Sequence, residues 1–207
     1  MSLTLRRYTE RPYLIDLLRT CELTLVSPAS WDDQNDSFYL NLYAQRTEQS
    51  NVFALCLTEA SETYHHWKVF SSGTSGVCIE FKRDPLLTWV RKQDGLSGAP
   101  VSYKTLKDLR ARRPSLDELP FWKRKAFADE LEFRLFYASS DKPTYLKRFT
   151  FNLSYISRIV LNPWLPRSVA DQVKATLLEI PGCETMKIYR STLVDNESWK
   201  SLAANKT

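Results

Sequence analysis

The chain has few of the residues on which common cofactor and metal sites depend. Its 207 residues include five glycines, four cysteines and two histidines. It contains neither G-x-x-x-x-G-K-[ST] nor G-x-G-x-x-G, which argues against a P-loop or a Rossmann phosphate site. It also lacks the G-x-S-x-G elbow of α/β-hydrolases. The cysteines form no C-x-x-C pair and the histidines, His65 and His66, are adjacent, so the spacing of zinc ligands is absent.

Long apolar segments are also missing. No apolar run approaches the ~20 residues that span a bilayer, and the N-terminal MSLTLRRYTERPY lacks the apolar core of a signal peptide. We therefore expect a cytoplasmic protein without a membrane partner. The length fits one domain with a sizeable core, so residues 1–207 are expected to form a single domain.

Cysteine and aspartate leave two alternative sites open. Cys56 and Cys78 lie inside apolar runs and are expected to be small buried core residues, although a Cys–His nucleophilic pair is not excluded. Asp32, Asp33 and Asp36 could hold magnesium, but an aspartate-rich loop is more often turn chemistry. We therefore predict no metal.

The positive charge of the chain is concentrated in one segment. Residues 104–125 contain eight Lys or Arg and three Asp or Glu, a net +5 that equals the formal charge of the whole chain. Tyr103, Phe121 and Trp122 are interleaved with it, so the segment could follow a phosphate backbone and stack on bases. The alternative is a solvated connection, because lysine-rich loops are common. The residues predicted to bind nucleic acid are Arg110, Arg112, Arg113, Lys123, Arg124 and Lys125.

The order of apolar patterns predicts strands with helices between them. Strands are expected at 3–9, 23–26, 52–58, 76–82, 100–103, 156–162 and 185–191. Helices are expected from Pro12, at Asp84-Pro85, near residues 120–128 and after Pro166. Residues 27–37, SPASWDDQNDS, are predicted to form a loop. This pattern predicts an α+β fold with a mixed, mainly antiparallel sheet and peripheral helices.

The stretch FADELEFRLFY, residues 127–137, carries charge on alternate residues. Glu130, Glu132 and Arg134 alternate with apolar residues, which predicts a strand with all three charged groups on one face. One interpretation is a solvated sheet face. The other is a catalytic site, in which glutamates stabilise positive charge on a sugar carbon and Arg134 keeps a glutamate ionised.

Two further clusters combine cationic and aromatic residues. RRY, residues 6–8, joins arginine, which binds phosphate with two hydrogen bonds, to tyrosine, which stacks on flat rings. HHWKVFSSGTSG, residues 65–76, puts Trp67 and Phe70 one helical turn apart before a Ser/Gly turn. Taken alone, each cluster fits a structural role better, as a charged edge strand and as a core-facing aromatic pair.

In chain order these pieces resemble a large family of uncharacterised bacterial proteins. The signatures of that family are a loop like FNDPFE, a tryptophan-tyrosine motif before a glycine-led strand, and a late E-x-E-x-R strand. The chain departs from them at Tyr39, which replaces the last acid of the loop, and at Phe70, which replaces the tyrosine. The blocks that carry the likeness span nearly the whole chain and are LTLRRYT, LTLVSPASWDDQND, LCLT, HHWKVFSSGTSGVCIEF, VSY and FADELEFRL.

That family is similar to a divergent branch of the ADP-ribosyltransferase fold, which implies an ADP-ribosyltransferase-like domain with NAD as co-substrate. The likeness implies that Glu132 contacts the ribose and drives cleavage of the nicotinamide bond, while Glu130 orients or deprotonates the acceptor. Arg7 would hold the diphosphate, and Tyr8 or Trp67 would stack on the nicotinamide. The residues that the likeness assigns to NAD are Arg7, Tyr8, Asn35, Asp36, Trp67, Phe70 and Ser71.

The leading hypothesis is an NAD-dependent ADP-ribosyltransferase of the bacterial toxin or phage-defence type. The basic segment suggests nucleic acid, either RNA or DNA, as the acceptor. Toxicity of such an enzyme implies an antitoxin protein as a partner. The alternative is a non-catalytic nucleic-acid-binding or protein-interaction module on the same fold.

Overall fold

The computed structural model of the chain describes residues 3–71 and 73–204. Their strands are β1 (Thr4–Glu10), β2 (Glu22–Val26), β3 (Asn51–Thr58), β4 (Gly76–Lys82), β5 (Leu96–Pro100), β6 (Ser102–Lys104), β7 (Trp122–Arg124), β8 (Glu132–Ser139), β9 (Leu146–Thr150), β10 (Ile156–Leu161) and β11 (Ile188–Arg190). Their helices are α1 (Arg11–Thr20), α2 (Gln34–Arg46), α3 (Tyr64–Phe70), α4 (Arg83–Val90), α5 (Leu106–Ala111), α6 (Arg167–Leu178) and α7 (Glu197–Ala204). Short 3-10 helices lie at Pro28–Ser30, Leu119–Phe121, Lys125–Glu130 and Leu153–Tyr155.

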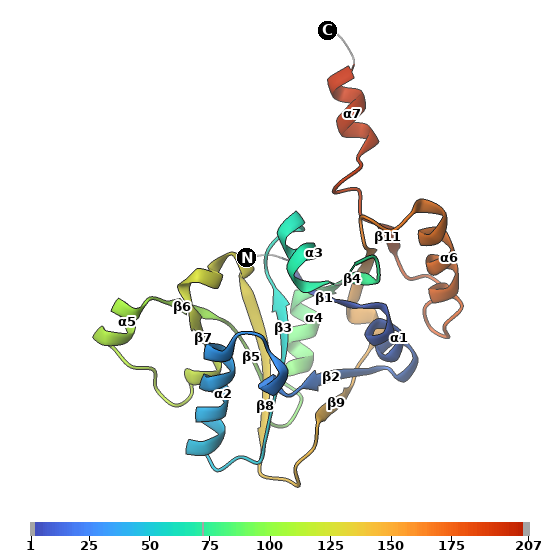
Figure 1. Ribbon diagram of the computed structural model, residues 1–207. Coiled ribbons are helices and arrows are strands. Elements are labelled where there is room, and N and C mark those ends of the chain that lie inside the picture. The colour runs from blue at the N-terminus through green and yellow to red at the C-terminus, as the bar shows by residue number, and fades with distance from the viewer. Residues whose placement is uncertain (1–2, 72, 205–207) are drawn as a thin grey trace.

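Within the described residues, nine strands form one mixed sheet in which only β10 and β11 pair in parallel. The main path is β11-β10-β4-β1-β3-β2-β9, and β8 followed by β5 extends from β3 as a branch (Figure 1). Strands β6 and β7 form a separate parallel pair. The prediction of an α+β fold with a mixed, mainly antiparallel sheet is confirmed.

Strand β3 is the junction of this sheet. Along one edge it pairs with β8, from Asn51 opposite Ser139 to Thr58 opposite Glu132. Along the other edge it meets β2 at Ala54 and β1 at Thr58. Because β1 and β2 pair with the same edge of β3 at different points, the sheet divides there into two arms.

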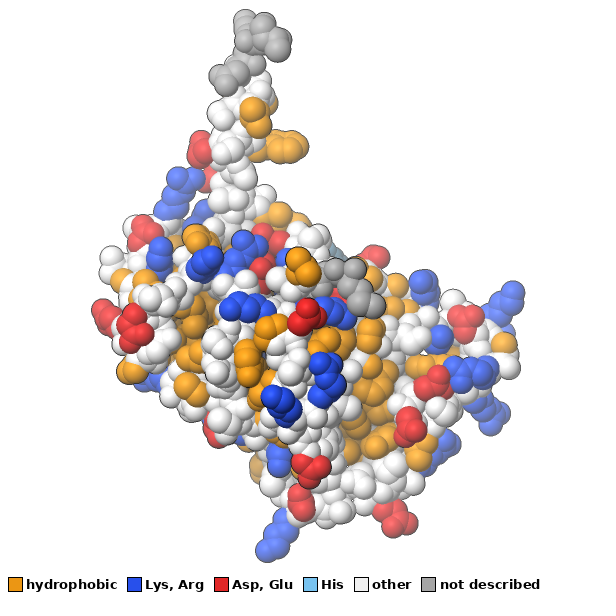
Figure 2. Space-filling model, turned by 180° about the vertical axis from the view of Figure 1, so that it is seen from behind, with side chains coloured by type: hydrophobic (Ala, Val, Ile, Leu, Met, Phe, Trp, Pro, Cys, Tyr) orange, Lys and Arg blue, Asp and Glu red, His pale blue; other side chains and the backbone are white. Residues whose placement is uncertain are grey.

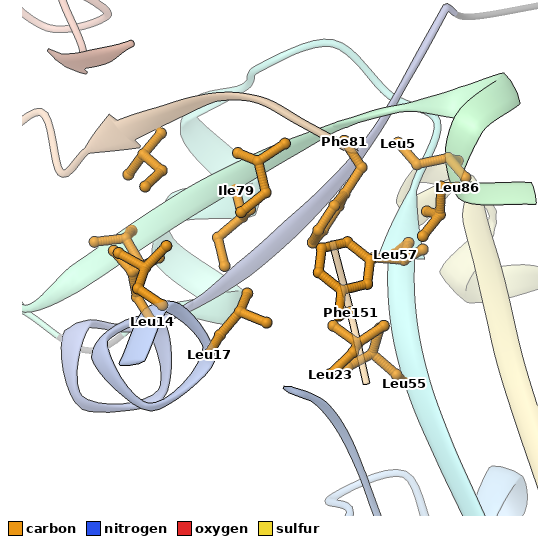
Figure 3. Close-up of a cluster of buried hydrophobic side chains, with 14 of the residues drawn as sticks. Leu5, Leu14, Leu17, Leu23, Leu55, Leu57, Ile79, Phe81, Leu86 and Phe151 are labelled. Carbon is orange, nitrogen blue, oxygen red and sulfur yellow. The ribbon is translucent and has the colours of Figure 1, made fainter. Parts of the chain in front are cut away.

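One face of the sheet holds the main hydrophobic core. Leu5, Leu57 and Ile79 occupy alternate positions of β1, β3 and β4, and their side chains are buried together. Leu14 and Leu17 of α1 pack against this face (Figure 3). Because successive side chains of a strand point to opposite faces, the polar residues of the same strands gather on the other side of the sheet.

A row of polar side chains crosses that other face. Strand pairing sets Arg158 opposite Glu80, Glu80 opposite Arg6, Arg6 opposite Thr58, and Thr58 opposite Glu132. The row therefore runs over five neighbouring strands, from β10 to β8. Neighbouring strands are about 4.8 Å apart, so Arg6 and Glu132 lie roughly 10 Å apart on the two sides of Thr58.

The helices predicted from Pro12, at Asp84-Pro85 and after Pro166 are confirmed as α1, α4 and α6. The loop predicted at residues 27–37 is wrong in its second part, where α2 begins. Asp33 caps this helix, because its carboxylate accepts hydrogen bonds from backbone N–H groups of the first turn.

Two predictions around residues 120–137 also need correction. The helix expected near residues 120–128 is wrong, since β7 and two 3-10 helices occupy this stretch. The strand expected to include Glu130 begins only at Glu132. Leu131 has a left-handed φ of 43°, which ends the 3-10 helix Lys125–Glu130 and turns the chain into β8.

The last helix, α7, projects from the body of the molecule (Figure 1). Figure 2 shows hydrophobic side chains on this projection, outside the main body. Trp199 and Leu202 are 79% and 77% exposed. The sequence predictions contained no element for this part of the chain.

Candidate functional site

A cavity of about 430 Å³ lies on the polar face of the sheet, beside the row that contains Thr58. Its size is within the range of roughly 300–1,000 Å³ that small-molecule sites occupy. Side chains from β1, β3, α2, α3, β7 and β8 line it. We call it the carboxylate pocket, because its charged lining residues are Asp32, Asp33, Asp36, Glu130 and Glu132, with Arg6 and Lys123 as the cations.

Arg134 does not line this pocket but fixes two carboxylates that do. Its Nε donates to Oε1 of Glu132 at 2.7 Å, and its Nη2 donates to Oε2 at 3.0 Å. Its Nη1 and Nη2 donate to the two oxygens of Asp36 at 2.8 and 2.6 Å. Nη1 also donates to the carbonyl of Pro120 at 2.8 Å. The guanidinium is fully buried, and a buried charge with this many partners holds both carboxylates in fixed positions.

Lys123 connects three carboxylates. Its Nζ lies 2.6 Å from Oε2 of Glu130, 3.2 Å from Oε2 of Glu132 and 3.7 Å from Oδ2 of Asp36. Burial alone would lower the pKa of Lys123, but the two glutamates raise it above its ordinary value. The lysine and Arg134 thus face three carboxylates, and one negative charge is left over when all are ionised.

The two glutamates of this cluster differ in proton affinity. Burial alone would raise the pKa of Glu132, but Arg134 and Lys123 lower it to about 2. Burial raises the pKa of Glu130, and the opposite effect of Lys123 does not cancel that rise. Neighbouring carboxylates whose pKa values are driven apart are typical of acid–base pairs. Of the two glutamates, Glu132 stays ionised and Glu130 is the one able to take up a proton, and burial raises the pKa of Asp36 as well.

Glu130 reaches the cluster from outside β8, so the prediction that it shares a strand face with Glu132 is wrong. The turn between the two residues is held by two hydrogen bonds. The hydroxyl of Thr58 donates to the carbonyl of Glu130 at 2.5 Å, and the N–H of Glu132 donates to the hydroxyl of Tyr103 at 2.7 Å. These contacts, together with Lys123, bring both carboxylates to the pocket from different elements.

Aromatic side chains form another part of the site. Tyr8 of β1 stacks on His66 of α3 with ring centroids 5.5 Å apart, and Phe70 lies 5.8 Å from the same imidazole. The Tyr8 hydroxyl contacts the Cys78 thiol, and the His66 ring contacts the backbone of Glu130. These aromatic groups are thus held in place by contacts within the protein.

Arg6 is the basic side chain on the β1 side of the pocket. Its Nε donates to Oε1 of Glu80 at 3.0 Å, and its Nη1 donates to the carbonyl of Ala60 at 2.7 Å. Arg158 donates to the same carboxylate at 2.8 and 3.0 Å. Burial opposes ionisation of Glu80, but Arg158 and Arg6 lower its pKa. Two cations share one carboxylate here, so this group carries one positive charge in excess.

A second cavity, of about 530 Å³, lies between α2 and the β6–α5–β7 segment. We call it the α2–β7 pocket. It shares Asp36 and Lys123 with the carboxylate pocket, so these two side chains form a common wall. Its other lining residues are Gln34, Asn35, Phe38, Tyr39, Lys104, Leu106, Leu109, Trp122 and Arg124.

The first-strand arginine assigned by the likeness does not reach either cavity. Arg7 pairs with the buried residue Ile79, so it points to the face opposite to that of Arg6 and Tyr8. Burial lowers the pKa of Arg7 to about 10. Arg7 therefore does not line the pocket, whereas Arg6 and Tyr8 do.

The second group of residues assigned to NAD is only partly brought together. Phe70 lines the carboxylate pocket, but Trp67 is 1% exposed and packs edge-on against Tyr8 behind the lining. Its Nε1 donates to Glu62 at 2.7 Å. The hydroxyl of Ser71 donates to the Trp67 carbonyl at 2.6 Å and lines neither cavity. The expectation that Trp67 stacks on a bound ring is therefore wrong, because its faces are covered by protein.

Asn35 and Asp36 do not line the same cavities. Asp36 lines both, whereas Asn35 lines only the α2–β7 pocket. The amide of Asn35 also donates to the capping carboxylate of Asp33 at 3.1 Å. Asp36 thus belongs to the carboxylate cluster, and the assignment of Asn35 to the same ligand is not supported by its position.

The six predicted nucleic-acid contacts occupy different environments. Lys123 is engaged by the carboxylate cluster and is 9% exposed. Arg112 donates to both oxygens of Glu118, at 2.8 and 2.7 Å, and lies 4.9 Å from the Trp122 ring. The prediction is therefore corrected for Lys123, whose charge is already satisfied inside the protein. The remaining four, all exposed, are Arg110, Arg113, Arg124 and Lys125.

Cys56 is a residue of the site that the sequence patterns did not predict. Cys56 was expected to be buried, but it is exposed to the carboxylate pocket, while Cys78 is buried as expected. Dense packing around Cys56 and the nearby Glu132 charge raise the pKa of its thiol, although one side is open. Alternation along β3 could have revealed Cys56, since it lies two residues before Thr58 and thus on the same face.

Comparisons of the chain with known protein families, with curated proteins and with solved structures found no match. Function is therefore inferred from the geometry of the site. Among residues 3–71 and 73–204, no helix is long and apolar enough to cross a bilayer. The same residues contain no group of three or more His, Cys, Asp or Glu arranged to hold a metal ion.

Proposed function

We propose that the protein is an NAD-dependent ADP-ribosyltransferase that acts at the carboxylate pocket. The observation that carries the proposal is the buried, ionised Glu132 in a cluster with one negative charge left over. Cleavage of a glycosidic bond develops positive charge on the sugar carbon, and a fixed carboxylate stabilises that charge. The convergence of Tyr8, Phe70 and Glu132 on one cavity also supports it, because the likeness assigned these three positions to NAD.

The charge distribution along the pocket fits the two halves of NAD. The nicotinamide ring carries a positive charge, and the acidic lining around Glu132 favours a cation. The diphosphate is anionic and would lie toward Arg6, the group with an excess positive charge. The lining as a whole is acidic, so it favours the nicotinamide riboside half more strongly than the diphosphate.

The aromatic lining of the pocket fits the same ligand. The Phe70 ring, 38% exposed, offers a surface for the nicotinamide. Tyr8 and Phe70 both contact His66, so the two rings are held in fixed relative positions.

The reaction needs one bond broken, one bond formed and one proton accepted. The bond between the ribose carbon C1′ and the nicotinamide nitrogen breaks, and its electron pair leaves with neutral nicotinamide. A hydroxyl or amine of the acceptor forms the new bond to C1′ and loses its proton to Glu130. The permanent charge on Glu132 stabilises the carbon, and the raised pKa of Glu130 suits it to accept that proton.

The acceptor and partner are part of the proposal. We propose nucleic acid as the acceptor, in the context of a bacterial toxin or phage-defence effector that an antitoxin protein would control. The exposed cations Arg110, Arg113, Arg124 and Lys125 support an anionic acceptor. Incubation with labelled NAD and cell extract identifies the labelled fraction, and label in protein alone would refute a nucleic-acid acceptor.

A non-catalytic binding module on the same fold is the second candidate. One observation favours it: both oxygens of Glu132 are already engaged by Arg134, and one of them also by Lys123. A buried ion network of this kind can also be purely structural. In that case the acidic pocket would bind a cationic ligand without changing it.

Replacement of Glu132 by Gln separates the two candidates. The amide keeps the shape and hydrogen bonding of the side chain but removes its charge. We expect the release of nicotinamide from NAD to fall by roughly 10²-fold or more. The matched control is Glu179→Gln, an exposed glutamate at the end of α6, which should leave the rate unchanged.

Thermal melts establish whether Glu132→Gln remains folded. If the variant melts at a lower temperature than the wild type, Glu130→Gln serves as the second test. Glu130 forms its ion pair with Lys123 at the edge of the cluster. A folded Glu132→Gln protein with wild-type turnover of NAD would show that the carboxylate is structural.

A further inference from the structure

We infer that the α2–β7 pocket binds a phosphorylated nucleoside unit, with its base against Phe38 and Tyr39 and its phosphate on Arg124 and Lys104. This inference deepens the proposed function, on which it rests, by giving the acceptor a site. Such a unit occurs in free nucleotides and in single-stranded nucleic acid, and the two sources share the chemistry that the pocket would recognise.

The charges of this pocket are the first reason. Asp36 and Lys123 in its wall are engaged with each other and with the carboxylate cluster. Lys104 and Arg124 form no ion pair within the part of the chain that the structure describes, and both line the cavity. The pocket therefore presents two cations that have no ion-pair partner among the described residues, and Lys104 lies over the Trp122 ring at 4.8 Å. Arginine binds phosphate through two hydrogen bonds, and lysine supplies a point charge.

One carboxylate outside the lining is close enough to affect these cations. Asp108 lies near Lys104, but it caps α5 through hydrogen bonds with Thr105 and does not line the cavity. Its carboxylate is thus bound at the N-terminus of α5. The cavity lining itself carries positive charge in excess.

The aromatic walls are the second reason. Phe38 is 60% exposed and its ring centroid lies 6.2 Å from that of Tyr39. Leu106 on the opposite element, α5, is 62% exposed. Exposed apolar side chains that face a cavity together with cations are suited to a flat ring that carries an anion. The side-chain amides of Gln34 and Asn35 add groups able to bond the edge of a base.

The shared wall is the third reason. A ligand in the α2–β7 pocket lies against Asp36 and Lys123, which are also residues of the carboxylate pocket. Lys123 in turn contacts Glu130, the proposed base. An acceptor bound here is therefore next to the reaction site without occupying the space proposed for NAD.

Isothermal titration of the full chain with nucleoside 5′-monophosphates and with ten-residue single strands of RNA and DNA tests the inference. No NAD is added. We expect binding by the wild-type protein and a loss of roughly 5- to 100-fold in Phe38→Ala, the range that a base–aromatic stack accounts for. Arg124→Ala should also weaken binding by about tenfold or more.

Matched controls keep the result specific. Tyr145→Ala removes an aromatic ring that is 94% exposed elsewhere, and Arg19→Ala removes an exposed arginine in the last turn of α1 that lines neither cavity. Both should bind as the wild type does. Binding of the monophosphate and the strand with similar affinity assigns the site to a single nucleotide unit, and much tighter binding of the strand assigns it to nucleic acid.

The inference is overturned if neither probe binds, or if Phe38→Ala and Arg124→Ala bind as tightly as the controls. Its failure is distinct from failure of the proposed function. Turnover of NAD without nucleotide binding would refute only the acceptor site. Nucleotide binding that persists in an inactive wild-type protein would refute only the transferase activity.

Discussion

The carboxylate pocket and the α2–β7 pocket share Asp36 and Lys123 but differ in the charge that their other residues contribute. The first adds Asp32, Asp33, Glu130 and Glu132 against Arg6, and the second adds Lys104 and Arg124. The shared pair is nearly neutral by itself. The unshared residues therefore decide that one cavity attracts cationic groups and the other anionic groups. The buried ion cluster lies between the acidic lining of the first and the basic lining of the second.

The largest expected effect comes from removal of the residue that fixes the shared wall. Arg134→Met leaves Asp36 and Glu132 buried without their main partner, which should cost about 3–5 kcal/mol of unfolding free energy. Urea denaturation measures this loss. Both cavities should lose their ligands even where the variant remains folded, because both contain Asp36.

Arg158→Met provides the comparison for Arg134→Met. Its guanidinium side chain is 47% exposed, and Glu80 keeps Arg6 as a partner when Arg158 is removed. A much smaller change in stability is therefore expected. Similar losses in the two variants would contradict the special role of the buried cluster.

The aromatic part of the carboxylate pocket allows the next test. Trp67→Ala removes a buried ring and should cost about 3–5 kcal/mol of stability, while the increase in melting temperature caused by NAD persists. Phe70→Ala removes a partly exposed ring of the lining and should reverse that pattern, with a small loss of stability and weaker NAD binding. Melting curves with and without NAD measure both quantities. A wild-type response to NAD in Phe70→Ala would remove this ring from the proposed site.

The opposite pKa shifts of the two glutamates predict the pH dependence of activity. Protonated Glu130 cannot accept a proton, so kcat/KM should fall as the pH drops through its pKa, which is raised above 4.5. Glu130→Gln should abolish this acidic limb and lower the rate at neutral pH. A limb that is unchanged in the variant would assign the proton transfer to another group.

The titration of Glu132 should appear in the pH dependence of stability and not in that of activity near neutral pH. Its folded-state pKa is lowered to about 2, so its contribution to stability is present above the ordinary pKa of ~4.3 and is lost as the pH falls toward 2. Glu132→Gln should flatten that part of the dependence of stability on pH. Denaturation midpoints between pH 2 and pH 5 measure the difference.

The smallest expected effect concerns the exposed cations. If Arg124 contacts a phosphate of a single strand, Arg124→Ala should reduce the slope of log K against log salt by about 0.7. Arg112→Ala should leave the slope unchanged, because Glu118 already binds both ends of that guanidinium. Equal changes in the two variants would indicate a diffuse basic surface in place of a defined pocket.

Local patterns were sufficient to predict most of the sheet and one end of the site. Alternation in E-x-R put Glu132 and Arg134 on one face, and the structure adds only that their carboxylate and guanidinium are bonded. The apolar runs of β3 and β4 and the proline-marked helices follow from the same local rules.

The missing parts depend on contacts between distant segments. Asp33 fits a turn residue and a helix cap equally well, and the aspartate-rich run around it favours the turn. Which of Arg6 and Arg7 lines the pocket depends on which face of β1 is covered by the core. Their neighbouring places in RRY do not reveal that face. Lys123 looks like part of a basic run, and only the fold brings it to Glu130 and Glu132.

The partners of Arg134 have a consequence for the order of folding. Its guanidinium bonds Asp36, 98 residues away in sequence, as well as the carbonyl of Pro120 and Glu132, two residues away. Contacts of such long range form late, because the chain between them must first be ordered. Until α2 and the 3-10 helix at Leu119–Phe121 are in place, enclosing this charge between β8 and its surroundings is unfavourable. We therefore expect Arg134 to couple completion of the core to correct assembly of both pockets.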